Sequence, residues 1–201
     1  MGAMIDASEF VAGTLSLDFV NTVGGIRSGP YRDKLETYRD LLDWAVLGGG
    51  LTKAEADRLG ALAAQTPARA ADALGEAKAF REALHAIFAA HLHHHAAATD
   101  ALARANDQIG RALSHARLAR DGERYVWRWE GTDALEAPLW AVARDAGRLL
   151  TDGALERLTE CASDTCGWFF LDTTKNRSRR WCDMKGCGNR DKVRRYRKKA
   201  G

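Results

Sequence analysis

Two matching stretches near the C-terminus set the fold, Cys161-Ala162-Ser163-Asp164-Thr165-Cys166 and Cys182-Asp183-Met184-Lys185-Gly186-Cys187. Each stretch begins and ends with cysteine, and 15 residues separate the two. The preceding 160 residues contain no cysteine, so these thiols form one local group rather than scattered core positions. Two short-spaced pairs separated by a loop are typical of a site where four thiolates bind one tetrahedral Zn²⁺. The spacing therefore predicts a zinc site whose ligands are Cys161, Cys166, Cys182 and Cys187.

Disulfide formation and redox switching are the competing interpretations of this group. Disulfides suit a secreted protein, but residues 1–8 lack the basic and then apolar segments of a signal peptide. A redox switch stays open, because thiolates beside Arg and Lys are readily oxidised. We favour zinc, since paired cysteines in an intracellular chain usually bind metal. Four sulfur ligands leave no open position on the metal, so we expect one structural Zn²⁺.

Length and charge limit the possible size, location and partners of the rest of the protein. A chain of 201 residues with 46% hydrophobic content can form one domain of ordinary size and a small second unit. No apolar run is long enough to cross a bilayer, so we expect a soluble, cytoplasmic protein without a membrane partner. Residues 175–199 carry a net charge of +10, whereas the first 174 residues carry −7. An acidic body with a basic tail is the pattern expected when the tail binds a polyanion.

The chain divides near residue 155. Residues 1–155 are predicted to be a mainly α body with a small β-hairpin (an α+β body), in which a glycine-rich loop spans 24–30. Alternating side chains around Asp121-Gly122 predict a hairpin of strands 114–118 and 125–129. Helices are predicted from apolar spacing, capping residues and Pro67, with the ranges 35–46, 52–64, 67–92, 99–113 and 135–150.

Residues 156–201 are predicted to be a small, treble-clef-like zinc finger. The segment 167–172 reads as a strand, and 180–182 is expected to return antiparallel to it. A final helix begins near Gly188, with Asn189, Val193 and Tyr196 on its inner face. So small a unit has almost no core of its own without zinc. We therefore expect loss of metal to unfold the finger and to leave the body, whose core lies before residue 155, folded.

Two parts of the sequence resemble known families. The stretch from Arg179 to Arg190 closely resembles the CGNR zinc finger, which is named for the tetrad Cys187-Gly188-Asn189-Arg190. Upstream, 17–22 and 40–45 resemble the ABATE domain that accompanies this finger in bacterial proteins. The resemblance covers nearly the whole chain and implies a stress-related transcription regulator.

The basic residues around the finger are the candidate nucleic-acid contacts. Some of them, such as Arg180, Lys185 and Arg190, can offset the formal −2 charge of Zn²⁺ with four thiolates. Asp191 is expected to pair with Arg195. The cations that lack a comparable acidic supply nearby are Arg177, Arg179, Arg194, Arg197, Lys198 and Lys199. Clustered charge of this kind reports affinity for polyanions. The candidate contacts are Arg177, Arg179, Arg180, Arg190, Lys192, Arg194, Arg195, Arg197 and Lys198.

Two further groups of polar residues lie in the body. Asp18 and Asn21 stand in an otherwise apolar segment, where they either cap a neighbouring element or line a pocket for an unknown small-molecule effector. His91 and His95 have the i, i+4 spacing of helical metal ligands. They lack the intervening Glu and the third ligand of a catalytic zinc site, so we expect them to face solvent.

Three classes of function fit these patterns. A DNA-binding regulator, whose body senses a ligand or forms a homodimer, explains both halves of the chain and is favoured. A zinc-stabilised adaptor for RNA or an acidic protein is the alternative. An enzyme is not expected, because the sequence has no phosphate-binding glycine loop, nucleophile elbow or metal-hydrolase motif.

Overall fold

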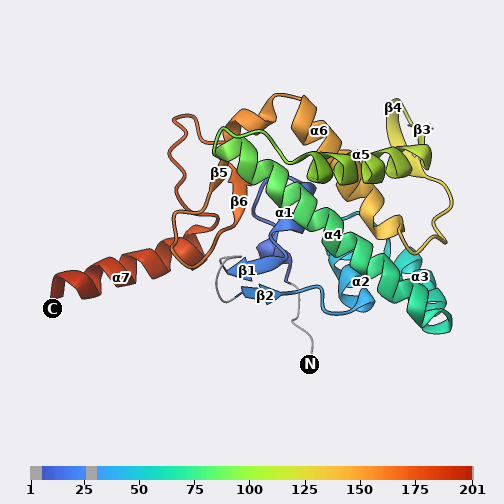
Figure 1. The fold of residues 1–201 in the computed structure, drawn as a ribbon, viewed down its shortest axis with the longest axis horizontal. Helices are drawn as coiled ribbons and strands as arrows, with labels where there is room; N and C mark the ends of the chain where they lie inside the picture. Colours follow the sequence, from blue (N-terminus) through green and yellow to red (C-terminus); the bar gives the residue numbers. More distant parts are fainter. Residues whose placement is uncertain (1–5, 26–30, 201) are drawn as a thin grey trace.

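Helices form most of the molecule (Figure 1). The computed structural model describes residues 6–25 and 31–200, without the side chains of Arg195 and residues 198–200. Among the described residues, no helix combines the length and the apolarity that a membrane crossing requires. The α-helices are α1 Leu15–Val20, α2 Tyr38–Leu47, α3 Lys53–Gln65, α4 Pro67–Leu92, α5 Thr99–Ser114, α6 Trp140–Thr151 and α7 Asn189–Ala200.

Capping residues explain where the helices begin. Thr37 Oγ1 accepts a hydrogen bond from the Asp40 N–H at 3.2 Å, and the Asp40 carboxylate accepts one from the Thr37 N–H at 2.7 Å. This capping box starts α2 at Tyr38, three residues after the predicted start at Leu35. An equivalent box of Thr52 and Glu55 starts α3. The five helices predicted in the body are confirmed, with shifts at their ends.

The described residues form three two-stranded antiparallel sheets beside the helices. They pair β1 Val23–Gly25 with β2 Tyr31–Asp33, β3 Ala116–Asp121 with β4 Arg124–Trp129, and β5 Leu158–Glu160 with β6 Phe169–Leu171. The predicted hairpin around Gly122 is confirmed as β3–β4. The β1–β2 pair replaces part of the loop predicted at 24–30, of which Gly29 and Pro30 lie outside the described residues.

The strand pairing predicted for the finger is wrong. β6 pairs with β5, which precedes it, and not with 180–182. The Asp172 carboxylate accepts hydrogen bonds from the N–H groups of Thr174 and Arg179, both at 2.8 Å. These bonds close the intervening loop on itself and turn the chain away from β6. The returning segment lies beside the first cysteine pair instead, where the Arg180 carbonyl accepts a hydrogen bond from the Ala162 N–H at 2.8 Å.

Body and finger share one hydrophobic core. Helix α1 is buried at its centre, where Phe19 lies 5.2 Å from the ring of Trp44 and 6.3 Å from that of Phe80. All three residues of β6 are buried in the same core, and Phe169 also contacts the ring of Phe88 on α4. The expectation that the core of the body lies before residue 155 is therefore wrong.

Candidate metal centre and basic helix

The four cysteines form one compact cluster. Their sulfur atoms all lie within 4.8 Å of one another, and all four residues are buried. The Sγ of Cys182 lies 3.6 Å from that of Cys166 and 3.6 Å from that of Cys187. A tetrahedron with Zn–S bonds of about 2.3 Å has sulfur atoms about 3.8 Å apart, whereas a disulfide needs about 2.05 Å. The geometry fits a tetrahedral metal ion and not a pair of disulfides.

The cluster also has the electrostatics of a cation site. Hydrogen bonds among the thiols lower the pKa of Cys161 and raise the pKa of Cys166 and of Cys182, so the groups become thiolates together only with a positive charge among them. A divalent metal ion meets that requirement, because it replaces the thiol protons. Arg190 supplies further positive charge from outside, since its Nη2 lies 3.0 Å from Cys187 Sγ. This hydrogen bond raises the pKa of Arg190 and keeps it a cation.

Backbone hydrogen bonds shape both cysteine turns. The Cys161 N–H donates to the Trp168 carbonyl at 2.9 Å, which closes the first turn onto the start of β6. In the second turn the Asp183 carboxylate accepts a hydrogen bond from the Gly186 N–H at 2.6 Å. A π-helical turn, Met184–Gly188, then leads directly into α7. The last ligand, Cys187, therefore lies immediately before the basic helix.

Arg179 points into the structure rather than toward a partner. Its Nη2 donates to the Val11 carbonyl at 2.9 Å and to the carbonyl of Cys182, and its Nε donates to the Trp181 carbonyl at 3.0 Å. The guanidinium also lies 4.3 Å from the ring centroid of Phe170. Arg179 was predicted as a nucleic-acid contact; in the structure it joins the second cysteine turn to the N-terminal segment.

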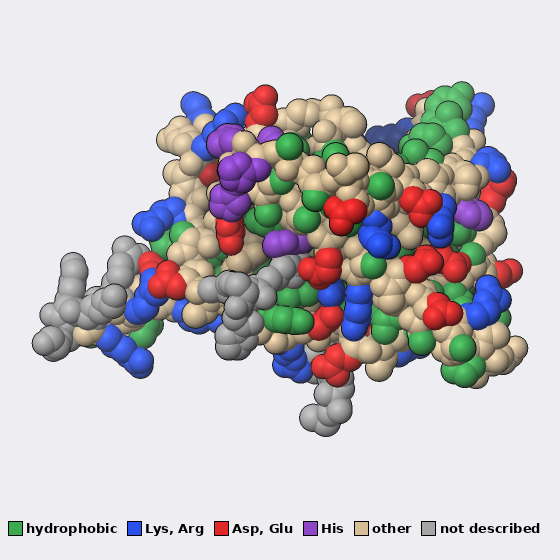
Figure 2. All heavy atoms as spheres, viewed as in Figure 1, with side chains coloured by type: hydrophobic (Ala, Val, Ile, Leu, Met, Phe, Trp, Pro, Cys, Tyr) green, Lys and Arg blue, Asp and Glu red, His purple; other side chains and the backbone are tan. Residues whose placement is uncertain are grey.

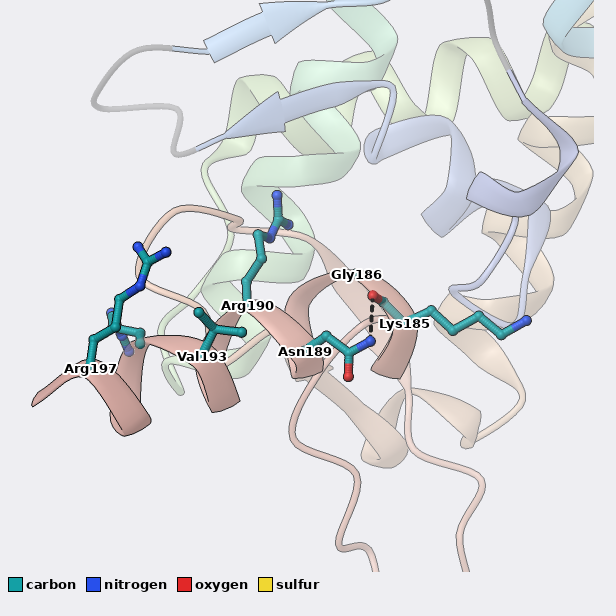
Figure 3. A pocket seen from close by; sticks show the side chains of 7 residues that line it. Lys185, Gly186, Asn189, Arg190, Val193 and Arg197 are labelled. Atoms are coloured by element: carbon teal, nitrogen blue, oxygen red, sulfur yellow. Dashed lines mark hydrogen bonds between the residues drawn. The ribbon is translucent and has the colours of Figure 1, made fainter. Parts of the chain in front are cut away.

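Helix α7 extends away from the body (Figure 1). As a result Val193 and Tyr196, predicted on an inner face, have exposed fractions of 50% and 75%. Seven residues near the start of the helix form a groove of about 760 Å³ (Figure 3). They are Lys185, Gly186, Asn189, Arg190, Val193, Arg194 and Arg197.

The predicted nucleic-acid contacts differ in their surroundings. Arg194 pairs with Asp191 at 3.0 Å and with Asp164, so the expectation that it lacks an acid is wrong. The expected Asp191–Arg195 pair lies outside the described side chains, as does the side chain of Lys198. Arg190, Lys192 and Arg197 are exposed on α7, and exposed Arg180 lies beside the first cysteine pair. Exposed Arg177 pairs with Glu156 at 3.9 Å, so it too has an acidic partner. Figure 2 shows acidic and basic side chains interspersed over the helical body, and Lys and Arg side chains on the described part of α7 with acidic side chains beside its base.

Asp18 and Asn21 do not form the predicted ligand site. Asp18 Oδ1 accepts a hydrogen bond from the Ala12 N–H at 2.9 Å. Asn21 bonds both backbone groups of Phe169: its Nδ2 donates to the carbonyl at 2.8 Å, and its Oδ1 accepts from the N–H at 3.0 Å. The cavity beside them measures about 10 Å³, which is at most one water molecule. Their role is the other one considered, the capping of neighbouring elements.

Among the described residues, the histidines at the end of α4 do not join other metal-ligating side chains in a group of three or more. His91 and His95 are exposed, as expected, and Figure 2 shows histidines gathered on this face. Within residues 6–25 and 31–200, the four cysteines are the one group of three or more metal-ligating side chains close enough to hold an ion.

A buried cluster of four cysteines followed by a basic helix defines a zinc-finger protein. The family model of the CGNR zinc finger matches residues 157–200. The ABATE family model, described as "Putative stress-induced transcription regulator", matches residues 13–153, more than half of the chain. The chain therefore belongs to the ABATE family and carries a CGNR zinc finger, as the resemblance indicates. No curated protein matches the chain.

Proposed function

We propose that the chain is a DNA-binding transcription regulator whose zinc finger presents α7 to duplex DNA. The observation that carries the proposal is the combination of a projecting basic helix with a metal cluster at its base. A major groove about 12 Å wide admits one α-helix, and twelve helical residues extend about 18 Å. The family's description as a transcription regulator supports the same function.

The metal holds the helix rather than performing chemistry. We propose one structural Zn²⁺ per chain, because four sulfur ligands complete its coordination. Cys182 and Cys187 fix the π-helical turn that precedes α7, and Arg190 binds the cluster from the first turn of the helix. The proposal gives the protein no enzymatic activity and places it in the cytoplasm.

Phosphate contacts are assigned to the cations that have no acidic partner in the part of the chain that the structure describes. Lys192 and Arg197 are exposed on α7 and have no acidic partner among the described residues. Arg194 has two acidic partners and Arg179 is bonded to carbonyl groups, so both are expected to contribute less. The helical body, in this proposal, senses an effector or forms a homodimer, through a surface other than Asp18 and Asn21.

The test is binding of the zinc-loaded, full-length protein to duplex DNA at several salt concentrations. The logarithm of the affinity should fall linearly with the logarithm of salt, and Arg197→Ala should reduce the slope by about 0.9. Arg104→Ala, an exposed arginine on α5, is the matched control and should leave the slope unchanged. Absence of salt-dependent binding to DNA contradicts the proposal. Tighter binding to structured RNA at the same salt supports the adaptor alternative.

A further inference from the structure

The β1–β2 pair of the ABATE domain lies next to the metal centre. A crevice of about 350 Å³ lies between the β1–β2 pair and the metal centre. Gly24, Arg32 and Lys34 line it from the body, and Asp183, Gly186 and Arg190 line it from the finger. The ABATE domain and the zinc finger therefore meet at this crevice, and each contributes basic side chains to its surface.

This crevice continues into the groove on α7. Gly186 and Arg190 line both hollows, so the two adjoin at these residues, with Arg197 lining the hollow on the helix and Arg32 lining the crevice beside β2. Figure 3 shows Arg190 rising from the first turn of α7 toward the β1–β2 strands, with Val193 and Arg197 further along the helix. A rod-shaped polyanion lying on α7 would reach the body at this place.

The β1–β2 pair is firmly held by the body. Side chains alternate along a strand, so Asp33 and Arg32 point to opposite faces of β2. Asp33 points inward and binds the buried Arg81 of α4 through two hydrogen bonds of 2.7 and 2.8 Å. Arg81 also donates to Thr22 Oγ1 at 3.0 Å. The bidentate contact fixes the strand, and with it the position of Arg32 on the outer face.

Among the described residues of this strand pair, Arg32 is the cation whose side chain is available to a partner. Lys34, on the same segment, pairs with Glu9 at 2.7 Å and lies 4.7 Å from the ring centroid of Trp168. The Arg32 backbone belongs to the β1–β2 ladder, whereas its exposed side chain forms no ion pair or hydrogen bond with any described residue. An unpaired guanidinium on a rigid strand is suited to bidentate binding of a phosphate.

We propose that the DNA interface extends from the finger onto the ABATE domain, where Arg32 binds a backbone phosphate beside those that α7 contacts. The inference rests on the proposed DNA binding and adds a second, rigid contact from the body. Contacts to phosphates fix the register and orientation of a protein on the duplex. Arg32 therefore sets the angle at which α7 meets the DNA, and a conformational change in the body alters that contact directly.

The experiment compares Arg32→Ala with wild type in DNA titrations at several salt concentrations, with zinc content measured in parallel. Loss of one phosphate contact reduces the salt slope by about 0.9 while zinc content stays unchanged. Arg32→Lys keeps the charge and is expected to retain most of the slope. Arg124→Ala is the matched control, because Arg124 is exposed on β4, far from α7 in Figure 1.

The outcomes separate this inference from the proposed function. Equal slopes and affinities for wild type and Arg32→Ala overturn the inference, and DNA binding by α7 stands if Arg197→Ala still weakens binding. Absence of duplex binding by the wild type removes both. Hydroxyl-radical footprints give an independent readout: Arg32→Ala should lose protection at one edge of the protected site, and an unchanged footprint contradicts the inference.

Discussion

Asp18 shows how a single buried carboxyl group affects the stability of the molecule. It has an exposed fraction of 9% and accepts a hydrogen bond from the Ala12 N–H. Burial raises its pKa from 3.8 to about 7, which outweighs the opposing effect of the backbone hydrogen bonds. The folded state therefore binds more protons than the unfolded state between these two pH values. By linkage, the contribution of Asp18 to stability decreases as pH rises from about 4 to about 7 and is constant above that.

Asp18→Asn should remove this pH dependence. The amide oxygen of Asn can still accept the Ala12 hydrogen bond, but no charge forms in the buried site. We expect the variant to exceed wild type by about 1–4 kcal/mol in unfolding free energy at pH 8, with a smaller difference at pH 5. Urea unfolding of both proteins at several pH values measures this difference in unfolding free energy. Parallel stability curves for the two proteins contradict the assigned pKa.

At the scale of elements, one side chain joins α1 to β6. Asn21 at the end of α1 satisfies both the N–H and the carbonyl of Phe169, and all these groups are buried. Removing the amide leaves two backbone groups without partners in a place that water does not reach. Each such group costs about 1–3 kcal/mol.

Asn21→Ala is therefore expected to lower the unfolding free energy by about 2–4 kcal/mol. Asn106→Ala, at an exposed position of α5, is the control and should change it by less than about 0.5 kcal/mol. Chemical denaturation followed by circular dichroism measures both. A loss at Asn21 no larger than at Asn106 means that the link between α1 and β6 contributes little.

The elements differ in how well the sequence predicts them. Helices such as α3 have local signals, a capping box and periodic apolar residues, so they are found with small errors at the ends. The β5–β6 pair has no such signal, because Leu158–Glu160 is too short to show alternation and its partner follows only after a cysteine turn. The cysteine spacing identifies the metal ligands from local sequence alone. The Arg179 side chain points inward because it donates a hydrogen bond to the Val11 carbonyl, which is distant in sequence. Its charge alone therefore suggests the wrong contact.

At the scale of the whole molecule, the shared core links metal binding to the stability of the body. Phe169, Phe170 and Leu171 pack with α1 and α4, and the cysteines flank them in the chain. Sequence patterns suggest two independent units because they do not show which apolar strand packs against which helix. The fold makes the finger part of the body's core.

Cys182→Ser should consequently destabilise the helical body as well as the finger. Without the metal, the segments before and after β6 are no longer held in place. The three buried apolar residues of β6 then lose part of their packing. We expect a lower melting temperature for the helical signal and one cooperative transition in the wild type. Thermal melts by circular dichroism provide the test. A body that melts at the wild-type temperature in Cys182→Ser restores the view of two independent units.

In the proposed function, a metal ion held by the four cysteines fixes the position of α7 for binding to DNA. The most direct measurement is the affinity for duplex DNA of wild type, Cys182→Ser and Arg197→Ala, with zinc content determined on the same samples. We predict about one zinc per wild-type chain, loss of both zinc and DNA binding in Cys182→Ser, and full zinc with weaker, less salt-dependent binding in Arg197→Ala. A full equivalent of zinc in Cys182→Ser, or DNA binding unaffected by both substitutions, contradicts the account.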